Sequence, residues 1–392
     1  MSADSSPEPT LNKESVVVYG LSSEGYQIAS KLASKGYKVS MIDETLGTAM
    51  ELRPEIAGDY RDLRSLLSDE VLMTIKSSRE SISNSRVIFF TPKLRRKDEE
   101  ILAEVKTKLG ESSKNMNQGT LFIFCLPAGI SGTREIIERI EHASGLTNAK
   151  EFSFAYSPLE LGKPTVFGCV SSSNKEIPHI AVAADAGVSA EVMTLSKAEL
   201  VHAQRVIAKY SGLASAFETA RRLTQSAADS PRDYKQIYAE DLSASLYDLN
   251  LILDSLETGD PILYLASGAS KSIESYGRFL VERVREFVRT RELKAARLKI
   301  VLFTDADTLE MRGDKLNLSA DLVERLRDYF SDIENLNIMK DGFTFPTGVE
   351  KTNLMIFLSG SAELKLTQLY EEQINMGRSH MMRANLPVEF VS

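Results

Sequence analysis

A glycine turn near the N-terminus has the residue types and spacing of a phosphate-binding turn. The apolar run 16–19 leads directly into Gly20, and Gly25 follows at the start of a helical pattern. Asp43 lies 23 residues after Gly20, at the end of the next apolar run. In a dinucleotide-binding βαβ unit, the glycines let the backbone approach the pyrophosphate and the acidic residue holds the ribose hydroxyls. The spacing therefore predicts a Rossmann-type unit.

The middle glycine of this pattern is replaced by Ser22, which weakens the expected cofactor site. The Ser22 side chain should crowd the point where a pyrophosphate would approach the backbone. We therefore expect weak NAD binding of low occupancy, with contacts from the glycine turn, from Asp43 and from the segments around Thr91 and Pro127. The alternative interpretation is a Rossmann-type lobe that is retained for its fold alone.

Metal and disulfide chemistry are not expected. Only two cysteines occur, Cys125 and Cys169, and both lie in apolar strand-like runs. These positions favour neither a disulfide framework nor a cysteine zinc site. His142, His179 and His380 are scattered singly, without the helical pairing or the acidic neighbours of a metal site.

The charge of the chain argues against a nucleic-acid partner. The 392 residues include 47 Lys and Arg and 55 Asp and Glu, which gives a formal net charge of −8. A local basic cluster, formed by Lys93, Arg95, Arg96 and Lys97, could contact a phosphate group. The alternative is the solvated start of a helix, balanced by the acidic residues that follow it.

No segment has the character of a membrane span or a signal peptide. No apolar run reaches the roughly 20 residues that a membrane-spanning helix needs. Residues 1–14 lack an apolar core and are expected to form a flexible tail. With the low cysteine content, these features favour a cytoplasmic protein without a membrane partner.

Short apolar runs alternate with helical patterns along the chain, which is the sequence form of βαβ units around a parallel sheet. The expected strands are residues 15–19, 38–42, 86–90, 121–126, 152–156 and 166–170 in a first lobe, and 299–303, 337–339 and 353–358 in a second. Helices are expected directly after Gly20 and at 196–225, 233–257, 273–293 and 319–329.

We predict an α/β fold with an N-terminal Rossmann-like parallel sheet, a central long-helix connector and a second, smaller C-terminal α/β lobe. The expected domains are the tail 1–14, the Rossmann-like domain 15–190, a central helical region 191–260 and the C-terminal lobe 261–392.

The apolar surface of the 196–225 helix predicts a homodimer. One stripe is formed by Leu200, Ile207, Tyr210 and Phe217, and it is widened by neighbours such as Val206 and Leu213. This surface is wider than the stripe of about 100° that one packing partner requires. A second copy of the chain is therefore expected to cover part of this helix.

Four motifs, taken in order, resemble a known family. They are 126–135 (LPAGISGTRE), 152–158 (FSFAYSP), 196–201 (SKAELV) and 305–314 (DADTLEMRGD). The nucleotide-sugar dehydrogenases of the UDP-glucose, UDP-N-acetylmannosamine and GDP-mannose type have similar motifs. In them, a Pro-x-Gly-Thr turn precedes an Ala-Tyr-Ser-Pro-Glu motif, a long central helix and an Asp-rich turn with an arginine. The likeness covers about residues 15–360 and implies a UDP-binding-like C-terminal lobe.

The resemblance also implies that the catalytic groups have been replaced. The family oxidises a sugar alcohol to a carboxylate in two hydride transfers through a cysteine-bound intermediate. Its glutamate, lysine, asparagine and cysteine would fall at Leu159, His202, Val206 and Gly268 of this chain. The nucleophile's loop best matches 265–272, with little further loop before the next helix.

Other polar groups could compensate in part. Lys209 shares a helix face with His202 and could supply the missing charge, and His202 could act as a base. The alternative is that His202 is a partly exposed helix residue and Lys209 a solvated one. Any contacts with a nucleotide or nucleotide sugar are expected to be weak and to come from Lys209, Lys271 and Arg312.

These observations favour a pseudoenzyme of this type, with a binding or assembly role and weak NAD(H) or nucleotide binding. One alternative is a divergent NAD-dependent oxidoreductase that acts on a nucleotide sugar by a one-step hydride transfer and needs no cysteine. Another is a scaffold without a small ligand.

Overall fold

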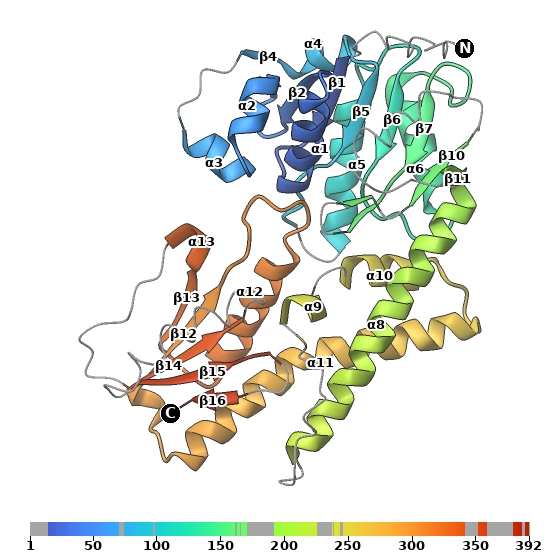
Figure 1. The fold of residues 1–392 in the computed structure, drawn as a ribbon. Helices are drawn as coiled ribbons and strands as arrows, with labels where there is room; N and C mark the ends of the chain where they lie inside the picture. Colours follow the sequence, from blue (N-terminus) through green and yellow to red (C-terminus); the bar gives the residue numbers. More distant parts are fainter. Residues whose placement is uncertain are drawn as a thin grey trace, which may run out of the picture. The chain divides into compact units, whose positions relative to one another are not determined.

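The computed structural model describes residues 15–69, 74–96, 99–160, 163–164, 166–170, 192–225, 237, 239–243, 246–341, 352–358, 379–385 and 389–391. The tail 1–14, Lys97 and His179 lie outside these residues. The chain forms two compact units (Figure 1). Unit 1 comprises residues up to 202 together with 309–312, and unit 2 comprises 203–308 and the residues from 313 onward.

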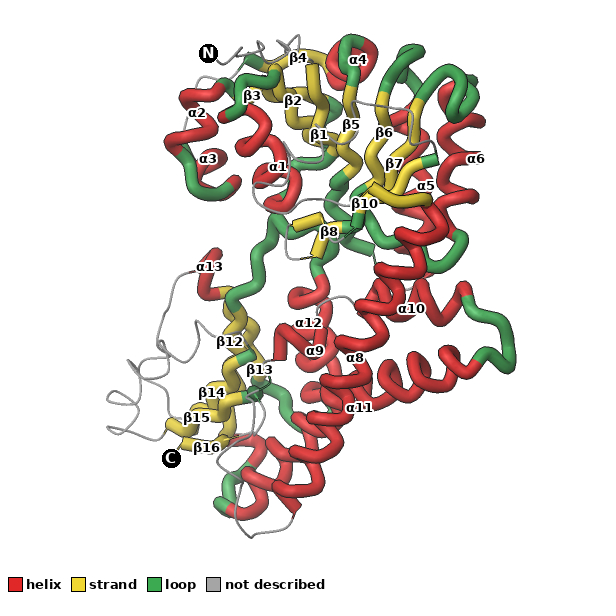
Figure 2. Tube along the Cα trace, turned by 45° about the vertical axis from the view of Figure 1, so that its right-hand side comes forward, coloured by secondary structure: helices red, strands yellow, loops and turns green. Residues whose placement is uncertain are grey.

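Unit 1 is built on a sheet of nine strands among the described residues, in the order β11-β10-β7-β6-β5-β1-β2-β3-β4 (Figure 2). The strands are β1 (Ser15–Tyr19), β2 (Lys38–Asp43), β3 (Thr48–Leu52), β4 (Ile75–Ser77), β5 (Val87–Phe90), β6 (Leu121–Phe124), β7 (Ser153–Tyr156), β10 (Phe167–Cys169) and β11 (Val192–Thr194). From β2 through β1, β5 and β6 to β7, neighbouring strands are parallel. β3 and β4 add antiparallel pairs at one edge, which the sequence analysis missed.

The central strands form the core of unit 1 because both faces of a parallel sheet are covered by helices. Val16, Val17 and Val18 of β1 are fully buried, as are Ile88 of β5 and Phe122 of β6. The helices are α1 (Ser23–Ser34), α2 (Pro54–Asp59), α3 (Leu63–Ser68), α4 (Ser78–Ser83), α5 (Glu99–Ser113) and α6 (Gly132–Ser144). α1 packs with α2, and α5 packs with α6.

Unit 2 carries a smaller sheet in the order β13-β12-β14-β15-β16. Its strands are β12 (Leu298–Thr304), β13 (Ile333–Asn337), β14 (Thr352–Phe357), β15 (Ser379–Arg383) and β16 (Glu389–Val391). Its helices are α9 (Ala239–Ser243), α10 (Leu246–Ser255), α11 (Pro261–Thr290), α12 (Asp314–Arg327) and α13 (Ile338–Asp341). The long helix α8 (Leu195–Gln225) begins in unit 1 and continues in unit 2. The two mainly parallel sheets and the long helix confirm the predicted fold class.

Several predicted boundaries were wrong. α11 begins at Pro261 and not near 273, because Asp260 caps it by accepting the Ile262 N–H at 2.9 Å and proline suits a first helical position. The segment 265–272 is therefore helical and not a loop. Residues 338–341 form α13 instead of continuing a strand over 337–339. The helix expected at 233–257 contains two shorter helices, α9 and α10, within its described part.

Most of the apolar stripe on α8 is covered within the chain. Ile207, Tyr210 and Phe217 are all buried, and the Phe217 ring makes edge contacts with Tyr276 and Phe279 of α11 at centroid distances of 5.8 and 5.6 Å. Leu200 is the exception, with 55% of its surface exposed. The homodimer therefore stays a prediction, and intramolecular packing explains much of the pattern on which it was based.

Gly25 of α1 packs closely against Thr91, the residue that follows β5. A Cβ at Gly25 would lie 2.6 Å from the Thr91 hydroxyl and 2.9 Å from the Ser22 hydroxyl, whereas a Cβ at Gly110 in α5 would meet nothing. Gly25→Ala should therefore destabilise the protein by about 1–3 kcal/mol. Gly110→Ala, as the matched control, should be neutral or stabilise by up to about 1 kcal/mol. Urea unfolding followed by circular dichroism measures both, and equal stability of the two variants would contradict this packing.

Candidate dinucleotide site

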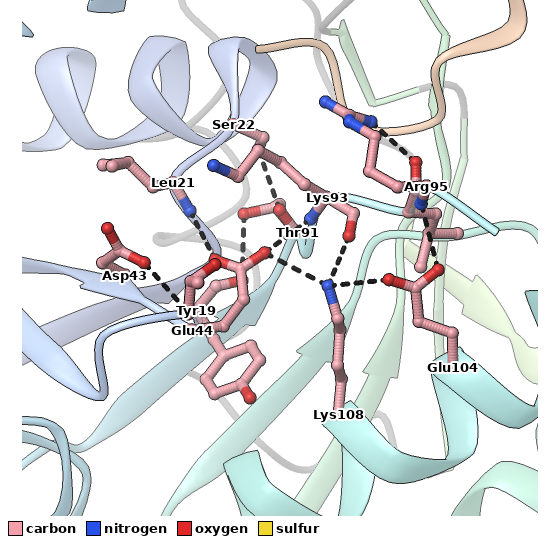
Figure 3. Close-up of polar contacts among 12 residues, drawn as sticks. Tyr19, Leu21, Ser22, Asp43, Glu44, Thr91, Lys93, Arg95, Glu104 and Lys108 are labelled. Atoms are coloured by element: carbon pink, nitrogen blue, oxygen red, sulfur yellow. Dashed lines mark hydrogen bonds and ion pairs between the residues drawn. The ribbon is translucent and has the colours of Figure 1, made fainter. Parts of the chain in front are cut away.

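The candidate site lies where the strand order of unit 1 reverses. β1 has β2 on one side and β5 on the other, so the chain crosses over β1 between these strands. Ligands of open α/β sheets bind at such a switch point, beyond the carboxyl ends of the strands. Here two turns leave that edge, the glycine turn after β1 and the segment 91–96 after β5 (Figure 3).

The two glycines of the turn are required by packing against Thr91. Gly20 has φ +120°, and a Cβ there would collide with the Thr91 carbonyl. Gly25 faces the Thr91 hydroxyl in the same way. Thr91 itself is fully buried and its N–H bonds to the Tyr19 carbonyl at 2.8 Å. The glycine spacing is thus explained by the contact between the turns, without any ligand.

The Ser22 side chain points into the protein, which corrects the expectation that it crowds a pyrophosphate. Ser22 is fully buried, and its hydroxyl donates to the Thr91 carbonyl at 2.8 Å. The same oxygen accepts the Gly25 N–H at 3.1 Å and caps helix α1. Ser22 therefore fastens the start of α1 to the turn after β5.

Asp43, the expected ribose ligand, is engaged in its own turn. One carboxylate oxygen accepts the N–H groups of Thr45 and Leu46 at 2.8 and 3.1 Å. Such a turn is a common use of aspartate after a strand. The carboxylate is therefore part of the connection from β2 to β3.

The residue that reaches the switch point is Glu44, which the sequence analysis did not single out. Its carboxylate accepts the Leu21 N–H at 3.0 Å and the Lys93 N–H at 2.8 Å, and so joins the two turns (Figure 3). The side chain is only 3% exposed. The only signal in the sequence was a second acidic residue directly after Asp43.

Lys108 and Glu104 of α5 complete a charged cluster beside Glu44. The Lys108 ammonium lies 3.4 Å from Glu44 and 3.1 Å from Glu104, and it also donates to the Lys93 carbonyl. Glu104 accepts the N–H groups of Arg95 and Arg96 at 3.0 and 3.1 Å. Burial alone would raise the pKa of the Glu104 carboxyl, but these donors outweigh burial and hold the pKa below its usual value.

The basic cluster after β5 contributes both backbone N–H groups and the Arg95 guanidinium, which donates to the Leu94 and Glu310 carbonyls at 2.6 and 2.7 Å. Glu44 and Glu104 bind the main-chain N–H groups of Lys93, Arg95 and Arg96. The Arg96 side chain pairs with Glu100 at 3.5 Å, with both side chains more than half exposed. Among the described residues, this pair agrees with the solvated start of a helix.

A short segment, 309–312, packs onto the same edge and belongs to unit 1. The Leu309 carbonyl accepts the Ser23 N–H at 2.8 Å, at the beginning of α1. The Met311 N–H donates to Glu24 at 2.8 Å, and the Met311 carbonyl accepts the Leu94 N–H at 2.6 Å. Met311 is 1% exposed and is part of the core of unit 1.

The turn after β6 is also occupied by a glutamate of the chain. Pro127 is buried, and Ser131 has φ +62° without capping α6 by its own side chain. Instead, Glu199 of α8 accepts the N–H groups of Ser131 and Thr133 at 3.1 and 2.9 Å. Glu199 is 3% exposed, so this helix start is closed by a buried carboxylate.

None of the positions matched to the family's catalytic groups carries the family's residue. Leu159 is buried in the core of unit 1. His202 is 3% exposed and packs edge-on against the Tyr156 ring, which corrects its interpretation as a partly exposed residue. Val206 is buried. Gly268 lies inside α11, where a Cβ would meet nothing.

The candidate substrate contacts are divided between the units. Lys209 and Lys271 belong to unit 2 and Arg312 to unit 1. The Lys209 ammonium lies 5.9 Å from the Tyr210 ring centroid, and Lys271 is exposed on α11. Within the described residues there is no group of three or more His, Cys, Asp and Glu that could hold a metal ion, and no helix suited to crossing a membrane.

Comparison with known proteins identifies the class of fold. No family model and no curated protein sequence matches the chain. Among solved structures, a UDP-D-ManNAc dehydrogenase from Pyrococcus horikoshii has a TM-score of 0.60 at 17% identity, with 88% of each chain covered. A UDP-glucose dehydrogenase from Pyrobaculum islandicum has 0.57 at 15% identity, covering 92% of this chain and 93% of its own.

The UDP-N-acetyl-mannosamine dehydrogenase Cap5O from Staphylococcus aureus is similar as well, with a TM-score of 0.58 at 14% identity and 88% of each chain covered. The fold is therefore that of the nucleotide-sugar dehydrogenases, which confirms the resemblance seen in the motifs at the level of the fold.

The residues at this edge do not fit a dinucleotide as they stand. The Leu21 N–H and the Ser23 N–H, which a bound pyrophosphate would need, already donate to Glu44 and Leu309. Asp43 is held in its own turn. NAD would have to displace the Glu44 and Leu309 contacts before it could use the turn.

The lowered pKa of Glu104 predicts a pH-dependent contribution to stability. A carboxyl whose pKa is depressed by folding stabilises the protein above its unfolded pKa, and this contribution is lost as the pH falls through the folded pKa. Glu104→Gln should lower the free energy of unfolding by about 1–3 kcal/mol at pH 7. The difference from the unmodified protein should narrow below about pH 4. Urea unfolding at a series of pH values measures it.

Glu100→Gln provides the matched control, because Glu100 lies one turn earlier on α5 and its side chain is 71% exposed. An exposed pair of this kind contributes little, so this variant should follow the unmodified protein at every pH. A Glu104→Gln difference that is independent of pH would show that the charge of Glu104 is not what stabilises the segment 91–96.

Proposed function

We propose that this chain is a nucleotide-sugar dehydrogenase-like protein that no longer oxidises sugars and works by binding or assembly. The fold supports the likeness, and the chemistry of the thiols supports the loss of activity. The family reaction needs an accessible thiolate. Cys125 and Cys169 are both buried, and burial raises the pKa of the Cys125 thiol far above its usual value.

The absence of a nucleophile does not depend on how the motif is aligned. Gly268, the position first matched to the cysteine, lies inside α11. The turn that precedes α11, residues 256–260, has no cysteine either, and α11 itself has none. The missing thiol is the observation that carries the proposal.

The alternative, a one-step NAD-dependent oxidoreductase, needs no cysteine but does need the cofactor and a base. His202 is buried against Tyr156, and the glycine turn is held by Glu44 and Leu309. Both features favour the binding role over the one-step reaction. Any NAD(H), nucleotide or nucleotide-sugar binding is proposed to be weak, and a cytoplasmic location is part of the same proposal.

The catalytic part of the proposal predicts no turnover. Purified protein incubated with NAD and UDP-glucose, UDP-N-acetylmannosamine or GDP-mannose should give no NADH absorbance above that of a protein-free control, because both cysteines of the chain are buried and supply no accessible thiolate. Steady production of NADH together with a uronic acid would refute the loss of activity. NADH with an aldehyde as the sole product would instead support the one-step alternative.

A homodimer through α8 is proposed as the assembly. Leu200 is 55% exposed on this helix although it is a large apolar residue, and the resembling family pairs its subunits through the corresponding helix. Permanent interfaces of this kind commonly bury about 2,000 Å² or more around an apolar centre.

Leu200 allows the dimer to be tested without disturbing the core. Light scattering after size exclusion should give about twice the 43.4 kDa mass of the chain for the unmodified protein. Leu200→Glu should lower this mass, since the charge would be buried in a dimer but solvated in a monomer. Leu46→Glu, at a residue 73% exposed in unit 1, should leave it unchanged. A single-chain mass for the unmodified protein at micromolar concentration would rule the dimer out.

A further inference from the structure

We propose that Glu44 is an internal anion that fills the phosphate turn of unit 1, so that the resting protein is closed to dinucleotides by its own chain. The inference rests on the proposed function and deepens it, because it gives a physical reason for weak cofactor binding. It also makes a statement about one carboxylate that can be tested apart from any activity.

Two backbone N–H groups at the switch point donate to Glu44. Leu21 lies between Gly20 and Ser22, in the turn whose N–H groups face a phosphate when such a turn binds one. Its N–H donates to the Glu44 carboxylate at 3.0 Å, and the Lys93 N–H from the other turn donates to the second oxygen at 2.8 Å. One carboxylate thus bridges both turns at the switch point, as an anionic ligand would.

The Glu44 side chain is buried, and a lysine balances its charge. Its side chain is 3% exposed, and a buried carboxylate is tolerated only where hydrogen bonds and a cation satisfy it. Lys108 supplies the cation at 3.4 Å and shares it with Glu104. The Lys108 ammonium is therefore already shared by two carboxylates and is not available to an entering phosphate alone.

The segment 309–312 makes two further contacts with the start of α1. The Ser23 N–H donates to the Leu309 carbonyl, and the Glu24 carboxylate at the start of α1 accepts the Met311 N–H. A negative side chain at this helix start satisfies the helix dipole that would otherwise attract an anion. The filling of the turn is therefore not confined to one hydrogen bond.

The proposal predicts that removing the carboxylate creates an anion site. Glu44→Ala leaves the Leu21 and Lys93 N–H groups without their acceptor and removes one of the two carboxylates beside Lys108. The melting temperature should fall by about 3 °C or more. Acetate or inorganic phosphate at millimolar concentration should then raise the melting temperature of the variant, because each binds the folded state alone. The unmodified protein should show no such rise.

Two further variants separate charge and site from general effects. Glu44→Gln keeps one acceptor oxygen in place, so it should lose less stability and respond less to either anion. Glu51→Ala removes a glutamate of β3 that pairs with Lys76 at 3.0 Å on the surface, and it should respond like the unmodified protein. Chloride at equal ionic strength controls for salt screening.

Hydrogen exchange on the unmodified protein tests the same point without any variant. The amides of Gly20, Leu21, Ser23, Thr91 and residues 93–96 should be protected in the absence of ligand, and millimolar NAD should not change their exchange. Fast exchange of these amides that slows when NAD is added would overturn the proposal. A Glu44→Ala variant that is as stable as the unmodified protein, and whose melting temperature does not change with anions, would overturn it as well.

Either result would leave the missing thiol, and with it the proposed loss of sugar oxidation, untouched. NADH production from a nucleotide sugar would refute the loss of activity instead.

Discussion

The edge of unit 1 depends on the hydrogen bonds between buried carboxylates and backbone N–H groups. Glu44 joins the turns after β1 and β5, Glu104 holds the segment after β5, and Glu199 closes the start of α6. Each bond joins a charged acceptor to a neutral donor, and such bonds are stronger than those between two neutral groups. The turns of a cofactor-binding sheet normally leave these donors open, and here the chain itself satisfies them.

A glycine pattern of this kind usually serves both close packing of the turn and phosphate binding. Here the two roles are separated. Gly20 and Gly25 are needed because Thr91 leaves no room for a side chain, so the pattern can persist through packing alone. A phosphate, by contrast, would need open N–H groups, and those of Leu21 and Ser23 are engaged. The glycine spacing was therefore a sound indicator of the fold and a poor indicator of a ligand. The Ser22 hydroxyl illustrates the difference, since it caps α1 and bonds to Thr91 rather than blocking a ligand.

The parts of the fold that were predicted are those with strong local patterns. β1, β5 and β6 are continuous apolar runs buried on both faces, and the sequence identified them nearly to the residue. β4 was missed because its three residues are exposed and show no apolar pattern. The start of α11 was missed because residues 265–272 were matched to the family's nucleophile loop, although Asp260 and Pro261 are an ordinary helix start.

The role of Glu44 could not have been predicted from local sequence, because its bonds reach Leu21 and Lys93, which are 23 and 49 residues away. Its placement also has an electrostatic consequence. Two unit charges about 4 Å apart interact by about 4 kcal/mol at the effective dielectric of a protein surface. A pyrophosphate entering beside Glu24 and Glu44 would meet this repulsion, while Lys108 is already shared by two carboxylates. Displacing Glu44 would in turn leave a carboxylate to be solvated elsewhere. The closed turn is therefore opposed to the cofactor by charge as well as by occupied donors, and substitution of Ser22 alone would not reopen it.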